Sequence, residues 1–177
     1  MKKTHHNGKR FVNQDRTIHL QNGWLNVLKW YFKGQKQPWP KYIKNHHQIK
    51  LPANIAPHAA AITFINHPTV LIQFNSLTII TDPVFSKRVS PLSWLGPKRI
   101  REPGLTLAQL PKIDVVTVSH NHYDHMDLAS LKQLHQDHHP LFIVPLGNAK
   151  FLKKSGIKNV IELDWWQNYC QRDYFGS

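Results

Sequence analysis

The strongest constraint on this chain is a compact run of metal-ligating residue types that reads His-x-His-x-Asp-His from His120 to His125. The run directly follows residues 114–118 (Asp-Val-Val-Thr-Val), which are short, β-branched and bounded by polar residues. Such a segment predicts a buried strand. The cluster therefore belongs to a loop at the carboxyl end of a strand, where α/β proteins usually build their ligand sites.

The spacing of these residues predicts a metal site. His120 and His122 lie two apart in extended chain, so their rings project to the same side and can reach one metal ion. Asp124 and His125 follow where the loop turns, and they can face a second ion beside the first. Neutral imidazole with carboxylate suits zinc, with iron and manganese as alternatives. A solvated, His-rich loop without metal is the competing interpretation.

Charge and composition limit the class of protein. The net charge is +13, and residues 1–60 hold 11 Lys and Arg against one acid, whereas residues 61–177 hold 12 against nine. A positive field of this kind attracts nucleic acid or an anionic membrane surface, and a solubilising face without a partner is the alternative. The single cysteine, Cys170, excludes a disulfide framework and favours a reducing compartment. Without a signal peptide or a membrane-spanning stretch, we expect a cytoplasmic protein, with peripheral attachment to the membrane as an option.

The chain predicts two parts. Residues 1–60 form a basic, aromatic extension and linker, with one helix over residues 23–32 that either packs on its own domain or lies on a membrane interface. Residues 61–177 form the compact part, which is α/β. Strand runs are expected over 61–65, 70–74, 77–81, 114–118, 141–144 and 159–163, and helices over 128–134 and 147–154. The turn at Asn75-Ser76 predicts a hairpin, and the later alternation of strands and helices predicts layers on a mixed sheet.

Several longer stretches resemble one known family. The cluster from His120 to His125 after a hairpin and a strand looks like the metallo-β-lactamase superfamily. The flanking stretches resemble its branch of N-acylphosphatidylethanolamine-hydrolysing phospholipases D: Asn66–Ile72, Thr81–Ser86, Leu95–Arg99, Leu110–Asp114, Ser119–Asp127, Val144–Gly147 and Val160–Trp166. The similarity covers residues 60–168, and the flanking stretches are more specific to the branch than the cluster alone.

The resemblance implies an αββα sandwich of two similar halves with two metal ions at one edge. By that pattern His120 and His122 bind the first zinc ion, and Asp124 and His125 bind the second. The family completes the site with another His, a bridging Asp and a final His, which we expect to lie beyond Ser177. The chain is therefore expected to be mainly the first half of a metallo-β-lactamase-like domain, truncated within residues 61–177.

Four further residues are weighed as supporting groups. Asp82 and His67 sit at predicted strand ends. A carboxylate such as Asp82 can accept a hydrogen bond from a ligand imidazole, here His120 or His122, although an Asp-Pro turn is the simpler role. His67 is interpreted as a pocket-lining residue. Trp165 and Trp166 either line an acyl or head-group pocket or pack in the core.

The resemblance implies a zinc-dependent phosphodiesterase of the phospholipase D type. A hydroxide held between two metal ions would attack the phosphorus of an N-acylphosphatidylethanolamine-like phospholipid, with Asp124 as metal ligand and catalytic residue. The expected partner is a phospholipid or membrane surface rather than nucleic acid, and a homodimer could supply the missing ligands. The alternatives are a lactonase or nuclease of the same superfamily, or a truncated inactive fragment. An isolated half should also expose the sheet face meant for the other half and self-associate.

Overall fold

The computed structural model describes residue 11 and residues 24–33, 38, 40–46, 48–74, 76–90, 94 and 98–170. The chain divides into two units, Met1–Trp39 and Pro40–Ser177. In the first unit, helix α1 (Trp24–Lys33) confirms the helix predicted from the aromatic pattern. Among the described residues, no helix combines the length and the apolar character that crossing a bilayer requires.

The division into units falls earlier than the predicted boundary after residue 60. Ile49 and Leu51 pack against the core of the second unit. The backbone N–H of Ile43 also donates to the carbonyl of Ile100 at 2.7 Å. Residues 41–60 were predicted as a linker because prolines interrupt them, but they belong to the second unit, and residue 60 already begins β1.

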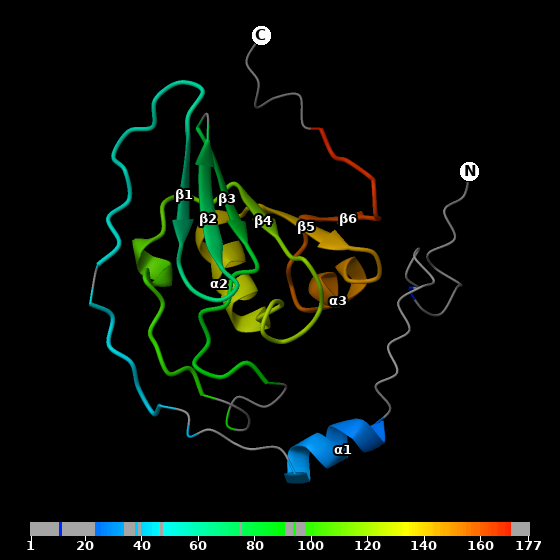
Figure 1. The fold of residues 1–177 in the computed structure, drawn as a ribbon. Helices are drawn as coiled ribbons and strands as arrows, with labels where there is room; N and C mark the ends of the chain where they lie inside the picture. The colour runs from blue at the N-terminus through cyan, green and yellow to red at the C-terminus, as the bar shows by residue number, and fades with distance from the viewer. Residues whose placement is uncertain are drawn as a thin grey trace. The chain divides into compact units, whose positions relative to one another are not determined.

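The described residues of the second unit form one mixed sheet in the order β1-β2-β3-β4-β5-β6 (Figure 1). Strands β1, β2 and β3 pair antiparallel, and β3 to β6 pair parallel. Their bounds are β1 (Ala60–Phe64), β2 (Val70–Phe74), β3 (Leu77–Thr81), β4 (Val115–Thr117), β5 (Leu141–Pro145) and β6 (Val160–Leu163). The α/β class, the hairpin of β2 and β3 and each predicted strand are confirmed; of the predicted turn, Asn75 lies outside the described residues.

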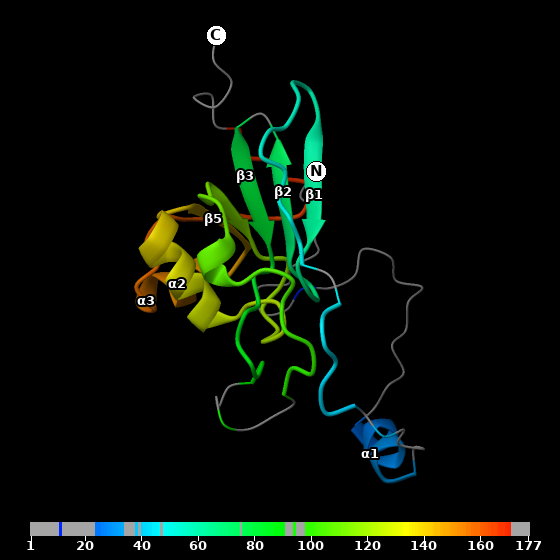
Figure 2. The same cartoon turned by 90° about the vertical axis from the view of Figure 1, so that its left-hand side faces the viewer.

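Helices cover one face of the sheet. Helix α2 (Leu128–His138) follows β4, and α3 (Ala149–Lys154) joins β5 to β6, while a short 3-10 helix η1 (Leu107–Gln109) lies in the loop before β4. Figure 2 shows α2 and α3 on the same side of the strands. A row of fully buried residues runs across that face in register: Leu71, Ile80, Val116 and Phe142. This row forms the core with apolar residues of the two helices, such as Leu131 and Leu152.

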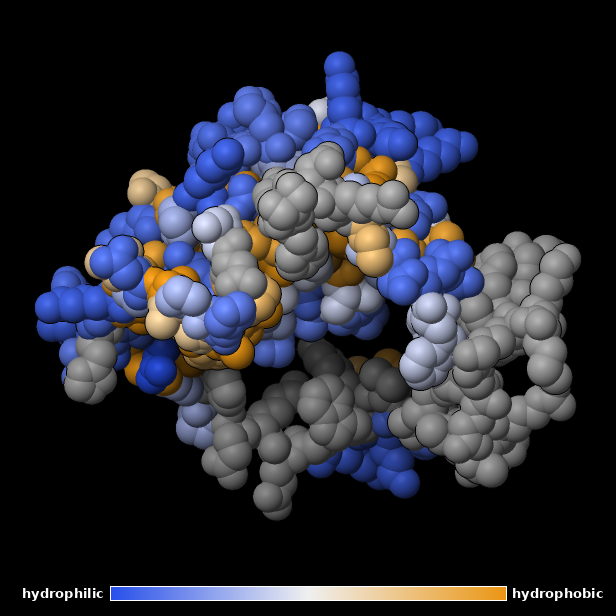
Figure 3. Space-filling view, turned by 90° about the horizontal axis from the view of Figure 1, so that it is seen from above, coloured by the Kyte–Doolittle hydropathy of each residue, from blue (hydrophilic) through white to orange (hydrophobic). Residues whose placement is uncertain are grey.

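The opposite face of the sheet is also apolar. Its central row in register consists of Ile62, Ile72, Ile79, Val115 and Leu141. On β1, Ile62 is 72% exposed and Phe64 is 66% exposed. Seen from above, hydrophobic side chains reach the surface between hydrophilic ones (Figure 3). Among the described residues the layering is therefore helix on sheet, as expected of one half of an αββα sandwich.

Candidate metal centre

The metal loop, residues 119–127, leaves the carboxyl end of β4 and turns sharply before α2. Buried Val118 and Met126 fix its two ends. The backbone N–H groups of His125 and Met126 both donate to the carbonyl of His122, at 3.0 and 2.7 Å. This turn brings His125 back toward the start of the loop, and its ring centroid lies 4.0 Å from that of His120.

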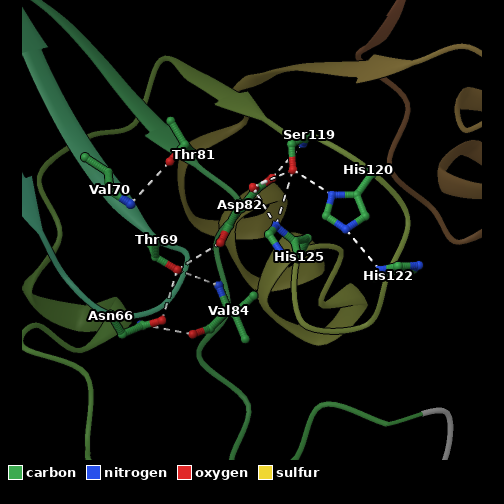
Figure 4. A network of polar contacts seen from close by, with 10 residues as sticks. All are labelled: Asn66, Thr69, Val70, Thr81, Asp82, Val84, Ser119, His120, His122 and His125. Atoms are coloured by element: carbon green, nitrogen blue, oxygen red, sulfur yellow. Dashed lines mark hydrogen bonds and ion pairs between the residues drawn. The ribbon is translucent and has the colours of Figure 1, made fainter. Parts of the chain in front are cut away.

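Asp82 anchors the loop from the end of β3. Its buried carboxylate accepts from the backbone N–H of Ser119 at 2.6 Å and from the Ser119 hydroxyl at 2.7 Å (Figure 4). It also lies 2.9 Å from Nδ1 of His125. Because a carboxylate only accepts, Nδ1 of His125 carries the hydrogen and Nε2 keeps its lone pair for a metal ion.

Ser119 fixes the position of the ring hydrogen of His120 in a similar way. The serine hydroxyl donates to Asp82, so its oxygen can accept from Nδ1 of His120, which lies 3.0 Å away. That arrangement leaves a lone pair on Nε2 of His120. Partial burial, followed by the nearby imidazoles of His125 and His122, lowers the pKa of His120. A lowered pKa favours the neutral ring, which is the form that binds metal.

His120 and His122 are arranged to share one ion. Nε2 of His120 lies 3.1 Å from Nδ1 of His122, and the two rings are edge to face (Figure 4). Two nitrogens that bind the same tetrahedral zinc ion at about 2.0–2.1 Å stand about 3.4 Å apart. The observed separation is close to that value, so these two side chains fit a common metal ion.

A second group of donors forms around His125. Ligand atoms of His67, Asp124 and His125 all lie within 4.8 Å of one another. His67 comes from the turn between β1 and β2, and its ring centroid is 5.7 Å from that of His125. His67 was considered only as a pocket-lining residue, yet the structure places it among the candidate ligands. The chemistry of this donor set, two imidazoles and a carboxylate, suits a zinc, iron or manganese ion.

The structure differs from the sequence-based expectation in the partner of Asp82. Asp82 was weighed as an acceptor for His120 or His122 against a role in an Asp-Pro turn. In the structure its direct imidazole partner is His125, and it reaches His120 through Ser119. The reason is the turn at the end of the metal loop, which returns His125 to the end of β3. Asp82 itself has a φ of 39°, a left-handed conformation that Asp tolerates better than most residues.

Two further residues, Thr69 and Asp127, hold the loop that carries Asp82. The buried Thr69 hydroxyl donates to the carbonyl of Asp82 at 2.8 Å and accepts from the backbone N–H of Val84 at 3.0 Å (Figure 4). The buried Asp127 carboxylate accepts from the backbone N–H of Ser86 at 2.9 Å. Sequence reasoning missed Ser119, Thr69 and Asp127 as positioning residues, although each stands within a stretch that carried the resemblance.

The two tryptophans that were predicted to line a pocket are distant from the metal loop in sequence. Trp165 and Trp166 directly follow β6, and they are 49% and 76% exposed. Neither lines the cavity beside the metal loop, which has a volume of about 620 Å³ and includes Tyr123, Leu128 and Phe151. Their assignment to an acyl or head-group pocket stays a prediction.

Comparison with known proteins gives one family and several partial relatives. The sequence model of the Beta-lactamase superfamily domain matches residues 78–173. The N-acyl-phosphatidylethanolamine-hydrolyzing phospholipase D 1 of Caenorhabditis elegans is 38% identical over 112 residues, which cover 60% of this chain and 32% of that protein. The mitochondrial N-acyl-phosphatidylethanolamine-hydrolyzing phospholipase D of Saccharomyces cerevisiae is 44% identical over 94 residues, which cover 53% of this chain and 20% of that protein.

Among solved structures, Igni18, a metallo hydrolase from the archaeon Ignicoccus hospitalis, is 18% identical with a TM-score of 0.48. The match covers 64% of this chain and 43% of that one. The chain thus spans a third or less of the two phospholipases that it matches.

Proposed function

Because this chain belongs to the beta-lactamase superfamily, we propose that it is a metal-dependent hydrolase that cleaves the phosphodiester of N-acylphosphatidylethanolamine-like phospholipids. The observation that carries the proposal is the 38–44% identity to two proteins whose names state that activity. The segment that matches the family model, residues 78–173, includes the metal loop. The convergence of His67, Asp124 and His125 in space gives independent support, since it does not depend on the relatives.

We assign the binding of one ion to His120 and His122, and of a second to Asp124 and His125, with His67 as an additional candidate ligand. When bound, such ions supply Lewis-acid stabilisation of the charge that develops on the phosphoryl oxygens. Asp82 and Ser119 act through hydrogen bonds: they fix the tautomers of His125 and His120 and hold both rings in place. Asp124, half-buried beside His125, can orient the attacking water as well as bind metal.

A membrane surface is the proposed location of the substrate. On helix α1, Leu28 and Phe32 are 41% and 78% exposed, and they stand four residues apart, on one side of the helix. Lys29 and Lys33 follow each of them directly. Exposed apolar side chains beside cations are typical of helices that lie on an anionic bilayer.

The test measures metal content and hydrolysis together. We expect the purified chain to bind zinc, iron or manganese and to lose this metal in the His120→Ala, His122→Ala double variant, whereas the exposed His46→Ala variant should keep it. The metal-loaded chain should release phosphatidic acid from N-acylphosphatidylethanolamine vesicles, and Asp124→Asn should abolish this release. Cleavage of RNA without cleavage of lipid would replace the proposal with the nuclease alternative, and retention of metal by the double variant would contradict the ligand assignment.

A further inference from the structure

A second cavity is lined in part by His67. Its volume is about 500 Å³, and it lies between the segment 45–49, the end of β1 and the loop 98–104. His67 belongs both to its lining and to the candidate ligand group with Asp124 and His125. A molecule bound in this cavity would therefore lie directly beside the metal centre.

The cavity is built by specific contacts. The N–H of Ile43 donates to the carbonyl of Ile100 at 2.7 Å, and the amide of Asn45 donates to the carbonyl of Glu102 at 2.9 Å. The N–H of Gly104 donates to the carbonyl of Ile65 at 2.8 Å. These bonds tie its three walls together, so the cavity is preformed and a ligand need not order them.

The floor of the cavity is apolar. It includes Ile49 and Ile65, of which Ile65 belongs to the buried core, and Phe64, which is 66% exposed at the edge of the cavity. Gly104 allows Ile49 to approach its backbone closely, because a Cβ there would stand 2.2 Å from Cδ1 of Ile49. A hydrocarbon chain laid on this floor would gain the usual free energy of apolar burial.

The rim of the cavity is cationic. Among the described residues, its lining includes Lys98, Arg99 and Arg101 against one carboxylate, Glu102. The Arg99 guanidinium donates to the carbonyl of Val84 at 2.8 Å, so it holds the loop after β3. Lys98 and Arg101 are exposed. Because they are already at the surface, both side chains can contact an anionic group of a ligand. The planar guanidinium of Arg can also donate two hydrogen bonds to one phosphate.

We propose that this cavity binds a phosphate-bearing amphiphile, with its alkyl chain on Ile49 and Phe64 and its phosphate at Lys98 and Arg101. The apolar floor alone would accept any lipid chain, and the cationic rim alone would accept any anion. Their combination selects a molecule with both parts. The role of the cavity in placing a substrate beside the metal centre rests on the proposed function, whereas the binding of the amphiphile does not.

The experiment uses the whole chain after removal of metal, so that binding is measured without hydrolysis. Three probes are titrated calorimetrically below the concentration at which micelles form: decyl phosphate, decyltrimethylammonium and inorganic phosphate. Decyl phosphate should bind at least roughly tenfold more tightly than either of the others. Lys98→Gln with Arg101→Gln should weaken it roughly tenfold, and Phe64→Ala should weaken it without changing the circular dichroism spectrum.

The matched control replaces two exposed lysines away from the cavity, Lys132→Gln with Lys158→Gln, and changes the net charge equally. It should leave the affinity for decyl phosphate unchanged. Equal weakening in both double variants would mean that the overall charge attracts the probe, and the cavity would be rejected. Inorganic phosphate that binds as tightly as decyl phosphate would also overturn the proposal, because the floor would then contribute nothing. Either result is independent of whether the chain hydrolyses lipid.

Discussion

Nδ1 of His125 donates a hydrogen bond to the carboxylate of Asp82 at 2.9 Å, although the two residues are 43 positions apart in the chain. The contact joins the end of β3 to the metal loop that follows β4. Strands β3 and β4 are parallel neighbours in the sheet. The same carboxylate also holds Ser119 through its N–H and its hydroxyl. One buried side chain therefore orients two candidate ligands, His125 directly and His120 through Ser119 (Figure 4).

The first prediction removes the charge of Asp82 and keeps its shape. Asn tolerates the left-handed backbone at this position, so Asp82→Asn should fold. It should weaken zinc binding about 10- to 100-fold, because its amide cannot accept all three hydrogen bonds and the imidazole orientation is lost. Competition with a chromophoric chelator measures this affinity. The exposed Asp137→Asn variant is the control, and equal zinc affinity in both variants would refute the role of Asp82.

Much of the fold was predictable because its signals are local. Each strand of the sheet stands out as a short β-branched or apolar run, and the glycine after α3, Gly156, adopts the φ of 98° expected of a helix end. The metal loop was recognisable for the same reason, since its four candidate ligands lie within six residues.

The parts that were not predictable depend on residues distant in sequence. The segment 41–60 looks like a linker, yet Ile49 packs on a core whose other residues follow it in the chain. Asp127 stands at the N-terminal end of α2, but its side chain makes no capping bond and instead accepts from Ser86, 41 residues earlier. The choice between such partners is decided by tertiary packing, for which local propensity gives no signal.

The second prediction concerns the loop that carries Asp82. The buried Asp127 carboxylate accepts from the N–H and hydroxyl of Ser86 and from the hydroxyl of Ser130. Asp127→Ala should leave buried donors without acceptors and lower the free energy of unfolding by about 2–4 kcal/mol. Urea denaturation measures the loss, with Asp137→Ala as the exposed control. A change below about 0.5 kcal/mol, which is usual for surface positions, would show that the loop is held without Asp127.

The third prediction tests whether residues 40–50 belong to the folded unit. In Gly104→Ala the new Cβ would stand 2.2 Å from Cδ1 and 3.1 Å from Cγ1 of Ile49. The side chain of Ile49 must move, and we expect a loss of about 1–3 kcal/mol in the free energy of unfolding. Adding Ile49→Val, which removes Cδ1, should recover part of that loss. Strictly additive effects in the double-mutant cycle would mean that Ile49 and Gly104 are not in contact.

The last prediction concerns the uncovered face of the sheet. Ile62 is 72% exposed on β1, the strand at the edge, and it begins an apolar row that runs through Ile72 and Ile79. A continuous apolar face that reaches the edge strand of the described sheet favours association between copies. We therefore expect the chain to self-associate at micromolar concentration, and Ile62→Lys to lower the weight-average mass in sedimentation velocity. Tyr42→Lys, at an exposed position outside the sheet, adds the same charge and should not lower the mass. A monodisperse monomer in the unmodified chain would mean that the exposed row does not drive association, and a drop in mass with both variants would point to net charge rather than to the sheet face.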